Sequence, residues 1–146
     1  MKENILRKLI FAIILLGLIG LIDAIYLTTK YYTQSSVFCS WLNNGCDLVT
    51  SSRYASFWGI PIALVGAVYY ALIIFLAVSL GHKSRPVVWN YVSILSAGGF
   101  MFSLWLLYLQ IFIIRAICFY CIISAAASIL IFIISLIYSL KNNKNE

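Results

Sequence analysis

Residues Val87 to Leu140 read VVWNYVSILSAGGFMFSLWLLYLQIFIIRAICFYCIISAAASILIFIISLIYSL, an apolar run in which Arg115 is the single charged side chain. A helix rises about 1.5 Å per residue, so this run as one helix would reach roughly 80 Å, whereas the hydrocarbon core of a bilayer is about 30 Å thick. The run must therefore fold back on itself. We expect Arg115 to mark the turn between two membrane spans, at about 87–110 and 117–140.

Two more spans precede this pair. Leu9 to about Thr29 forms one, and the uncharged stretch from Phe57 to Leu80 forms the other. The whole chain is 64% hydrophobic and only 10% charged, against roughly 25% charged residues in soluble domains. The sequence predicts an all-α integral membrane protein, with residues 1–146 forming a single domain. That domain is a four-helix transmembrane bundle with a long outer loop between the first two spans.

The basic residues flank the spans and predict their orientation. The side that carries both termini and the loop between the second and third spans holds most of them: Lys2, Arg7, Lys8, Lys83, Arg85, Lys141 and Lys144. The opposite side holds only Lys30, Arg53 and Arg115. Because Lys and Arg accumulate on cytoplasmic loops, both termini should face the cytoplasm. Charges scattered in this way also argue against a nucleic-acid-binding surface, which would need a basic patch.

All four cysteines then fall on the outer side, in two pairs. Cys39 and Cys46 lie in the long loop, and Cys118 and Cys121 form a CxxC motif at the start of the fourth span. Disulfides form and persist in the oxidising compartment outside the cytoplasm. Two short-range pairs on one face of the membrane indicate thiol–disulfide chemistry.

The CxxC spacing has a chemical reason. In the first turn of a helix, residues three apart share a face and stand within reach of a disulfide. The thiol nearest the helix N-terminus meets free backbone N–H groups and the positive end of the helix dipole, which favour its thiolate. Arg115 is expected to add positive charge nearby. Cys118 is therefore predicted to be the attacked sulfur, and Cys121 to lie deeper in the membrane.

Two other interpretations of the cysteines stay open from the residues alone. Cys39 and Cys46 could form a structural clip in a disulfide-stapled scaffold without catalytic function. Four cysteines could also bind zinc, but the six residues between Cys39 and Cys46 exceed the usual ligand spacing, and an oxidising compartment removes thiolates. We expect no metal. Asn43, Asn44 and Gly45 indicate a turn between the loop cysteines.

At this point the sequence resembles the vitamin K epoxide reductase family in its short bacterial form. The resemblance covers nearly the whole chain: four spans, a cysteine pair before the second span, and CxxC opening the fourth. Its most specific stretch is residues 46–61, CDLVTSSRYASFWGIP. The other quinone-coupled disulfide-forming family carries CxxC in its first outer loop, which this chain lacks.

The resemblance implies a membrane thiol–disulfide oxidoreductase that supports disulfide formation outside the cytoplasm. Cys39 would accept electrons from a thioredoxin-fold dithiol protein, Cys46 would pass them to Cys118, and Cys121 would reduce a quinone of the ubiquinone or menaquinone type bound nearby. The partner would be a separate protein, since no fused thioredoxin-like domain is visible. The implied location is the cell (inner or plasma) membrane, with the active site on its outer face.

Three further positions bear on the chemistry. Ser52 matches a family serine proposed to hydrogen-bond the active-site region, but Ser51 or Ser52 also fits a helix N-cap. Animal members carry a tyrosine where this chain has Ala125, and an asparagine that is absent from the second span. Plain quinone reduction is therefore favoured over vitamin K epoxide reduction. Asp23 is an ionisable residue near the outer end of the first span, so it either has a function or reaches interfacial water.

Overall fold

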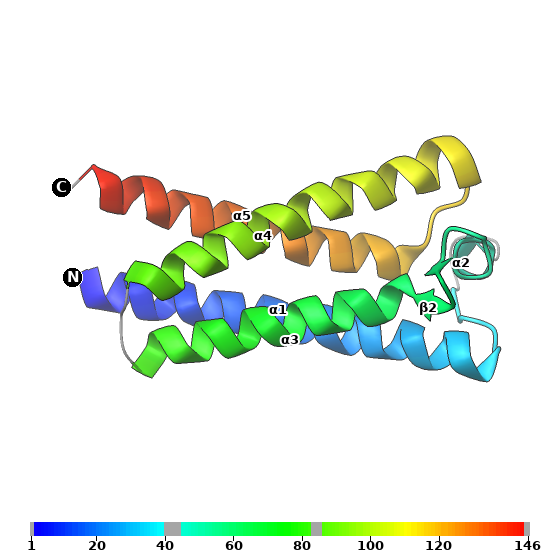
Figure 1. Ribbon diagram of the computed structural model, residues 1–146, viewed down its shortest axis with the longest axis horizontal. Coiled ribbons are helices and arrows are strands. Elements are labelled where there is room, and N and C mark those ends of the chain that lie inside the picture. The colour runs from blue at the N-terminus through cyan, green and yellow to red at the C-terminus, as the bar shows by residue number, and fades with distance from the viewer. Residues whose placement is uncertain (1, 40–44, 83–85, 145–146) are drawn as a thin grey trace.

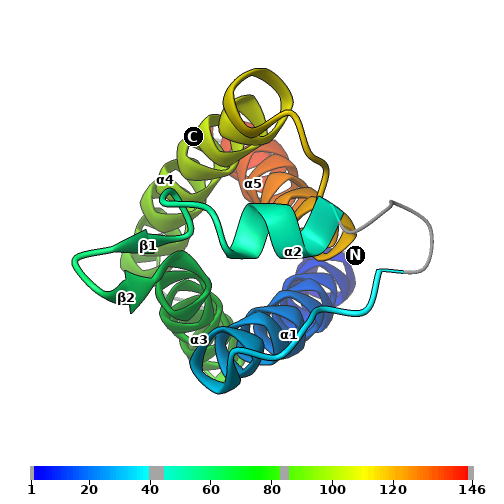
Figure 2. The same cartoon turned by 90° about the vertical axis from the view of Figure 1, so that its right-hand side faces the viewer.

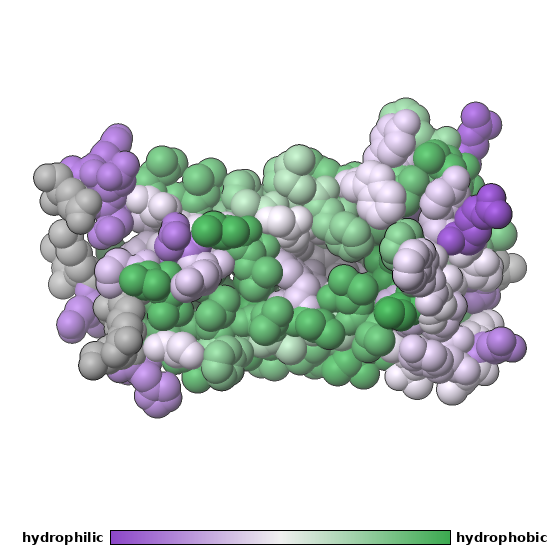
Figure 3. All heavy atoms as spheres, viewed as in Figure 1, coloured by the Kyte–Doolittle hydropathy of each residue, from purple (hydrophilic) through white to green (hydrophobic). Residues whose placement is uncertain are grey.

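The computed structural model describes residues 2–39, 45–82 and 86–144. Within these residues, four helices are long and apolar enough to cross a membrane: Glu3–Thr33, Ile62–His82, Pro86–Ile114 and Phe119–Asn143. They run side by side as a long bundle (Figure 1). On the face shown in Figure 3, apolar side chains cover the middle of the bundle and hydrophilic side chains gather towards both ends. The prediction of an all-α, four-span membrane protein is confirmed.

The helices occupy the corners of a square when the bundle is viewed along its axis (Figure 2). Helix α1 (Lys2–Thr33) packs against α3 (Ile62–His82) and α5 (Phe119–Asn143), and α4 (Pro86–Tyr108) packs against α5 and α3. Glycines permit the close contact between α1 and α3: a Cβ on Gly20 would lie 2.4 Å from the ring of Tyr70. Small residues at helix contacts are the usual means by which membrane helices approach closely.

The turn expected at Arg115 is present. Helix α4 continues as one π-helical segment, η1 (Leu109–Ile114), and Arg115 follows it with a φ of 54°. A left-handed residue ends the helix and reverses the chain, and the extended Cys118 then leads into α5. The two spans predicted within residues 87–140 are therefore separated from each other at Arg115, as expected.

The second span begins later than predicted. The expected start was Phe57, but residues 56–61 form a small antiparallel hairpin of β1 (Ser56–Phe57) and β2 (Ile60–Pro61). Its two-residue turn has positive φ at both Trp58 (53°) and Gly59 (80°), as hairpin turns of this length require. Pro61 ends the hairpin, and α3 begins at Ile62.

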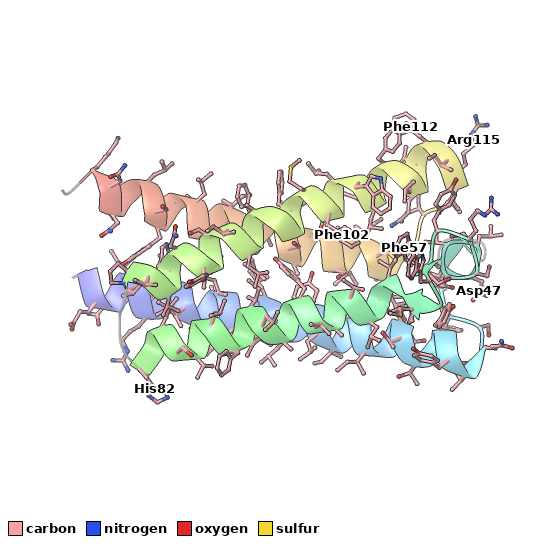
Figure 4. The ribbon with its side chains drawn as sticks, viewed as in Figure 1. Asp47, Phe57, His82, Phe102, Phe112 and Arg115 are labelled. Atoms are coloured by element: carbon pink, nitrogen blue, oxygen red, sulfur yellow. A yellow bond between two sulfur atoms is a disulfide. The ribbon has the colours of Figure 1, made fainter. Side chains whose placement is uncertain are left out.

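The chain termini lie at one end of the bundle, and the long connection between α1 and α3 covers the other end (Figure 1). This connection contains the short helix α2 (Gly45–Thr50), which lies across the end of the four helices (Figure 2). The turn at Arg115 is at the same end as α2, whereas His82 is at the end that carries the termini (Figure 4). The bundle end beneath α2 is where the predicted site residues meet.

Candidate active site

The structure brings all four cysteines into one apolar cluster. Cys46 from α2 and Cys118 before α5 are both buried, at 0% exposure, and Cys39 and Cys121 pack at the edge of the same cluster. Cys39 and Cys46 form a disulfide with their Cα atoms 6.2 Å apart. Cys118 and Cys121 are free thiols. The two pairs predicted from the sequence therefore meet at one site, with a different redox state in each pair.

Gly45 explains how α2 reaches the CxxC motif. An added Cβ at this position would lie 2.5 Å from the carbonyl oxygen of Ile117, closer than real side chains approach. The backbone of α2 thus rests directly on the backbone that precedes α5. Because Cys46 follows Gly45 and Cys118 follows Ile117, this backbone contact places the two buried sulfurs in the same cluster.

The segment that carries Cys39 is held over α5 by polar contacts. The backbone N–H of Val37 donates a 2.7 Å hydrogen bond to a carboxylate oxygen of Asp47 in α2. The hydroxyl of Tyr120 donates a 3.2 Å bond to the carbonyl oxygen of Phe38, and its ring packs 5.0 Å from that of Tyr26 in α1. Cys39 is therefore positioned by α1, α2 and α5 together.

Cys118 and Cys121 occupy different positions in the local structure. Cys118 is the N-cap of α5, just outside the membrane-spanning helix, and Cys121 lies in its first turn. A hydrogen bond from the Cys121 thiol lowers the pKa of the Cys118 thiol below its ordinary value, while burial opposes it by raising that pKa. Cys118 is thus the more acidic sulfur of the pair, the one favoured to carry the charge when one of the two thiols ionises.

The expected contribution of Arg115 to this thiolate is wrong. The Arg115 side chain is exposed and points away from the bundle (Figure 4). The cause lies in its left-handed backbone conformation, which turns the chain outward at the end of η1. The dominant influence on Cys118 is its neighbour Cys121.

Gln110 is a site residue that the sequence interpretation missed. Its side-chain oxygen accepts a 3.1 Å hydrogen bond from the backbone N–H of Cys118, and the residue is buried. Its own backbone carbonyl also accepts the N–H of Ala116. Gln110 therefore fixes the start of α5 from the preceding helix. An amide within an otherwise apolar run, five residues before the turn, is the signal that indicates such a role.

A cavity of about 400 Å³ opens beside the cysteine cluster, between the four long helices and beneath α2. Its walls are mainly apolar and include Leu27, Val49, Pro61 and Leu106, and Cys121 is the cysteine that lines it. Small-molecule sites in proteins are typically apolar cavities of about this size or larger, with a few polar groups. The polar side chains here include Asp23, Ser52, Tyr70, Gln110 and Ser124.

The structure decides between the two interpretations of Ser52. No helix begins at Ser51 or Ser52; both residues follow the end of α2, so the N-cap alternative is wrong. The Ser52 hydroxyl instead donates a 2.7 Å hydrogen bond to the carbonyl oxygen of Val49. Ser52 also lines the cavity; a role in the active site stays a prediction.

Two further positions considered in the sequence, Asp23 and Ala125, lie at the wall of the cavity. Asp23 is buried, at 7% exposure, and lines the cavity rather than reaching interfacial water. Ala125, which stands at the position of the animal tyrosine, also lines the cavity. The predicted turn at Asn43 and Asn44 lies outside the described residues. Among the residues that are described, no group of three or more His, Cys, Asp and Glu side chains is arranged to hold a metal ion.

Comparison with known proteins agrees with this geometry. A model described as the vitamin K epoxide reductase family matches residues 11–136, nearly the whole chain. The chain belongs to this family. The matched region of the vitamin K epoxide reductase model begins within α1 and ends within α5, so it includes the four helices, both cysteine pairs and the cavity.

One curated relative is the protein named Thiol-disulfide oxidoreductase LTO1, from Arabidopsis thaliana. It is 29% identical over 122 residues, which cover 79% of this chain and 32% of that protein. The chain therefore spans about a third of the length of this relative.

Proposed function

We propose that this chain is a membrane thiol–disulfide oxidoreductase that oxidises a dithiol protein and reduces a membrane quinone. One observation carries the proposal: four cysteines form a single cluster that has an outward-lying sulfur at one side and a cavity at the other. Cys39 lies in the loop outside the bundle, and Cys121 lines the cavity between the helices. The named activity of the Arabidopsis relative supports the same chemistry.

Electrons move through this cluster by thiol exchange. A thiolate of the partner attacks Cys39, so that a mixed disulfide forms and Cys46 leaves as a thiolate. Cys46 then attacks Cys118 of the oxidised CxxC pair, and Cys121 leaves as a thiolate. Resolution of the first mixed disulfide by the second partner thiol releases an oxidised partner and a reduced Cys39.

The relay closes when Cys39 attacks Cys46. The Cys39–Cys46 disulfide forms again, and Cys118 leaves as the thiolate that the Cys121 thiol stabilises by its hydrogen bond. The structure has this disulfide together with free Cys118 and Cys121, which is the state that holds the electron pair next to the cavity. Oxidation of this thiolate–thiol pair gives the CxxC disulfide, two electrons and the proton of the Cys121 thiol.

The cavity fits a quinone ring as the acceptor of that electron pair. A quinone is a flat apolar ring with two carbonyl oxygens, and the cavity combines apolar walls with a few buried polar side chains. Cys121 is placed to react there, while Ser52, Gln110 and Asp23 supply polar atoms. A thioredoxin-fold protein, which carries an accessible dithiol, is the partner that suits Cys39.

Quinone reduction is preferred to vitamin K epoxide reduction because of Ala125. The animal members have a tyrosine hydroxyl at this position, whereas here the cavity wall carries a methyl group. A purely structural role would account for the Cys39–Cys46 disulfide but not for the free thiols of Cys118 and Cys121 in the same cluster. The first experiment tests the structural alternative by following the sulfurs themselves.

In that experiment, Cys39→Ala should accumulate a disulfide between Cys46 and Cys118. Without Cys39, the mixed disulfide formed by attack of Cys46 on Cys118 has lost the sulfur that resolves it. Non-reducing mass mapping of the purified variant should show the two peptides linked. The double variant Cys39→Ala/Cys118→Ala is the matched control and should show no such link. Cys46 found free, or joined to Cys121, would overturn the proposed order of exchange.

A second prediction concerns the sulfurs beside the cavity. Cys118→Ala or Cys121→Ala should abolish quinone reduction driven by a small dithiol, because the two-electron donor needs both sulfurs. Cys39→Ala should retain the dithiol-driven reaction and lose oxidation of a thioredoxin-fold protein. Quinol formation by the purified chain in detergent measures both. Normal turnover of quinone by the Cys118 variant would exclude the CxxC pair as the donor.

A further inference from the structure

Asp23 is a buried acid for which the thiol relay gives no role. It lies in α1, within a membrane-spanning helix, and is 7% exposed. Its carboxylate oxygen Oδ2 is buried and has no hydrogen-bond partner among the described residues. Ionisable side chains inside membrane spans are costly, and those that occur mark sites of function by default.

The surroundings of Asp23 are apolar or uncharged. Of the described residues that line the cavity, Asp23 is the single acid, and none is a Lys, Arg or His. The titratable groups that interact with it lie on the two helices packed against α1: Tyr70 of α3, and Cys118, Tyr120 and Cys121 at the start of α5. A carboxyl group with no cation beside it is favoured in its neutral form, which carries a proton that can be transferred.

Reduction of a quinone requires protons as well as electrons. The thiolate of Cys118 and the thiol of Cys121 give two electrons and one proton as the S–S bond forms. The quinol gains two electrons and two O–H bonds, so a second proton must come from another group. Both protons must reach the quinone oxygens inside a cavity with few groups that exchange protons. Asp23 is the acid of the described cavity wall, and it lines the same cavity as Cys121.

We propose that Asp23 is the proton-donating residue of the quinone site. Its carboxyl group gives a proton to a carbonyl oxygen of the quinone as the electron pair leaves the CxxC dithiol. The Cys121 thiol supplies the second proton of the quinol, and a proton from water then restores the neutral carboxyl of Asp23. This inference rests on the proposed function.

A purely structural role would be served by any polar side chain of the same shape. Asn has the size and hydrogen-bonding capacity of Asp but cannot donate a proton from a carboxyl group. Asp23→Asn therefore keeps the packing of α1 and removes the proposed chemistry, and Asp23→Glu restores the acid with one more methylene group. Thr28→Val is the matched control on the same helix, because Thr28 bonds the carbonyl of Ala24 and does not line the cavity.

The test compares these variants in dithiol-driven quinone reduction as a function of pH. Asp23→Asn should lower the rate by on the order of 10²-fold, the usual effect of removing a general acid, and should change the pH profile. Asp23→Glu should regain a measurable part of the rate, and Thr28→Val should match the wild type. Quinone affinity, followed by quenching of tryptophan fluorescence, should be the same in the Asn variant as in the wild type.

An infrared difference spectrum supplies a readout that does not depend on turnover. The reduced-minus-oxidised spectrum of the wild type should contain a carboxylic acid band that shifts in D₂O and is absent from Asp23→Asn. Wild-type rate and pH profile in the Asn variant would overturn the inference, as would a Glu variant as slow as Asn. If the wild type itself does not reduce quinone, the proposed function fails instead, and formation of the Cys46–Cys118 link in Asp23→Asn/Cys39→Ala tests the relay separately.

Discussion

The two sulfurs of the CxxC motif differ because the helix begins between them. Cys118 has an extended backbone and stands outside the helix, and its N–H is bonded to the Gln110 side chain. Cys121 belongs to the first helical turn and faces the cavity. The hydrogen bond from the Cys121 thiol to the Cys118 thiolate joins them. This asymmetry is the reason for which we propose thiol exchange at the first sulfur and quinone chemistry at the second.

A pair of single-thiol variants tests this hydrogen bond. With Cys39 and Cys46 both replaced by Ala, Cys121→Ser retains a donor for the Cys118 thiolate and Cys121→Ala removes it. A hydrogen bond to a charged group contributes about 1.5–3 kcal/mol, so the pKa of Cys118 should be lower in the Ser variant by about one pH unit or more. The pH dependence of alkylation by iodoacetamide measures each value. Equal pKa values in the two variants would show that burial alone governs Cys118.

Helix α2 is the element that connects the two cysteine pairs. Six residues are too few for a helix to be stable alone in water, so its position depends on its attachments. These are the disulfide from Cys46 to Cys39, the bond from Val37 to Asp47, and the contact of Gly45 with the backbone of Ile117. Only the last of these sets the distance between α2 and the CxxC motif.

Gly45→Ala should therefore slow electron transfer between the pairs. The new methyl group would meet the Ile117 carbonyl oxygen at 2.5 Å, and overpacking of this kind costs about 1–3 kcal/mol. If about 1.4 kcal/mol of this cost adds to the barrier for attack of Cys46 on Cys118, thiol exchange between them slows about tenfold. The measurement is the rate at which the Cys46–Cys118 link forms in the Cys39→Ala background.

Gly81→Ala is the control for this variant. Gly81 lies near the end of α3, and an added Cβ there meets no atom within 4 Å. It should form the link at the rate of the parent. Quinone reduction driven by a small dithiol should be unchanged in Gly45→Ala, because that reaction bypasses α2. If Gly45→Ala formed the link at the rate of the parent, the contact between Gly45 and Ile117 would not control exchange between the two cysteine pairs.

The bundle as a whole places the cysteine cluster at one end and both termini at the other (Figure 1). The excess of Lys and Arg at the end with the termini predicts that this end is cytoplasmic. In a background without other cysteines, a membrane-impermeant maleimide should label Cys39 in intact cells. A cysteine introduced by Gly81→Cys should be labelled only after the membrane is opened. The reverse pattern would contradict the proposed orientation.

The sequence was sufficient for the architecture because membrane spans follow from length and apolarity alone. The turn at Arg115 was predictable, since a single charge interrupted a run too long for one crossing. The hairpin at residues 56–61 was not, because its apolar residues Phe57, Trp58 and Ile60 are exposed and have the same composition as a span. Its signal is the Trp58–Gly59 turn, which requires positive φ at both positions.

The cysteines of the candidate site could be predicted from the sequence, but the residues that hold them in position could not. Cysteine spacing identified two pairs, but their contact depends on Gly45, which resembled one residue of a flexible turn. Gln110 and Tyr120 act through bonds to backbone atoms distant in sequence, and no local pattern encodes such partners. Arg115 shows the opposite error: proximity in sequence predicted an electrostatic role that the outward direction of its side chain removes.

The burial of Cys46 and Cys118 determines which dissolved thiols can exchange electrons with the proposed relay. Both middle sulfurs are sealed from solvent, at 0% exposure, whereas Cys39 is partly exposed and Cys121 borders the cavity. Electrons can therefore enter or leave the proposed relay only at its two terminal cysteines, Cys39 and Cys121. While α2 covers these sulfurs, charged thiols of the size of glutathione have no direct access to them, so such thiols exchange electrons with the proposed relay only at Cys39. A small uncharged dithiol has a second route, through the cavity that Cys121 borders. For charged thiols, leakage of electrons to the membrane quinones is thereby limited to the entrance that a docking protein can cover.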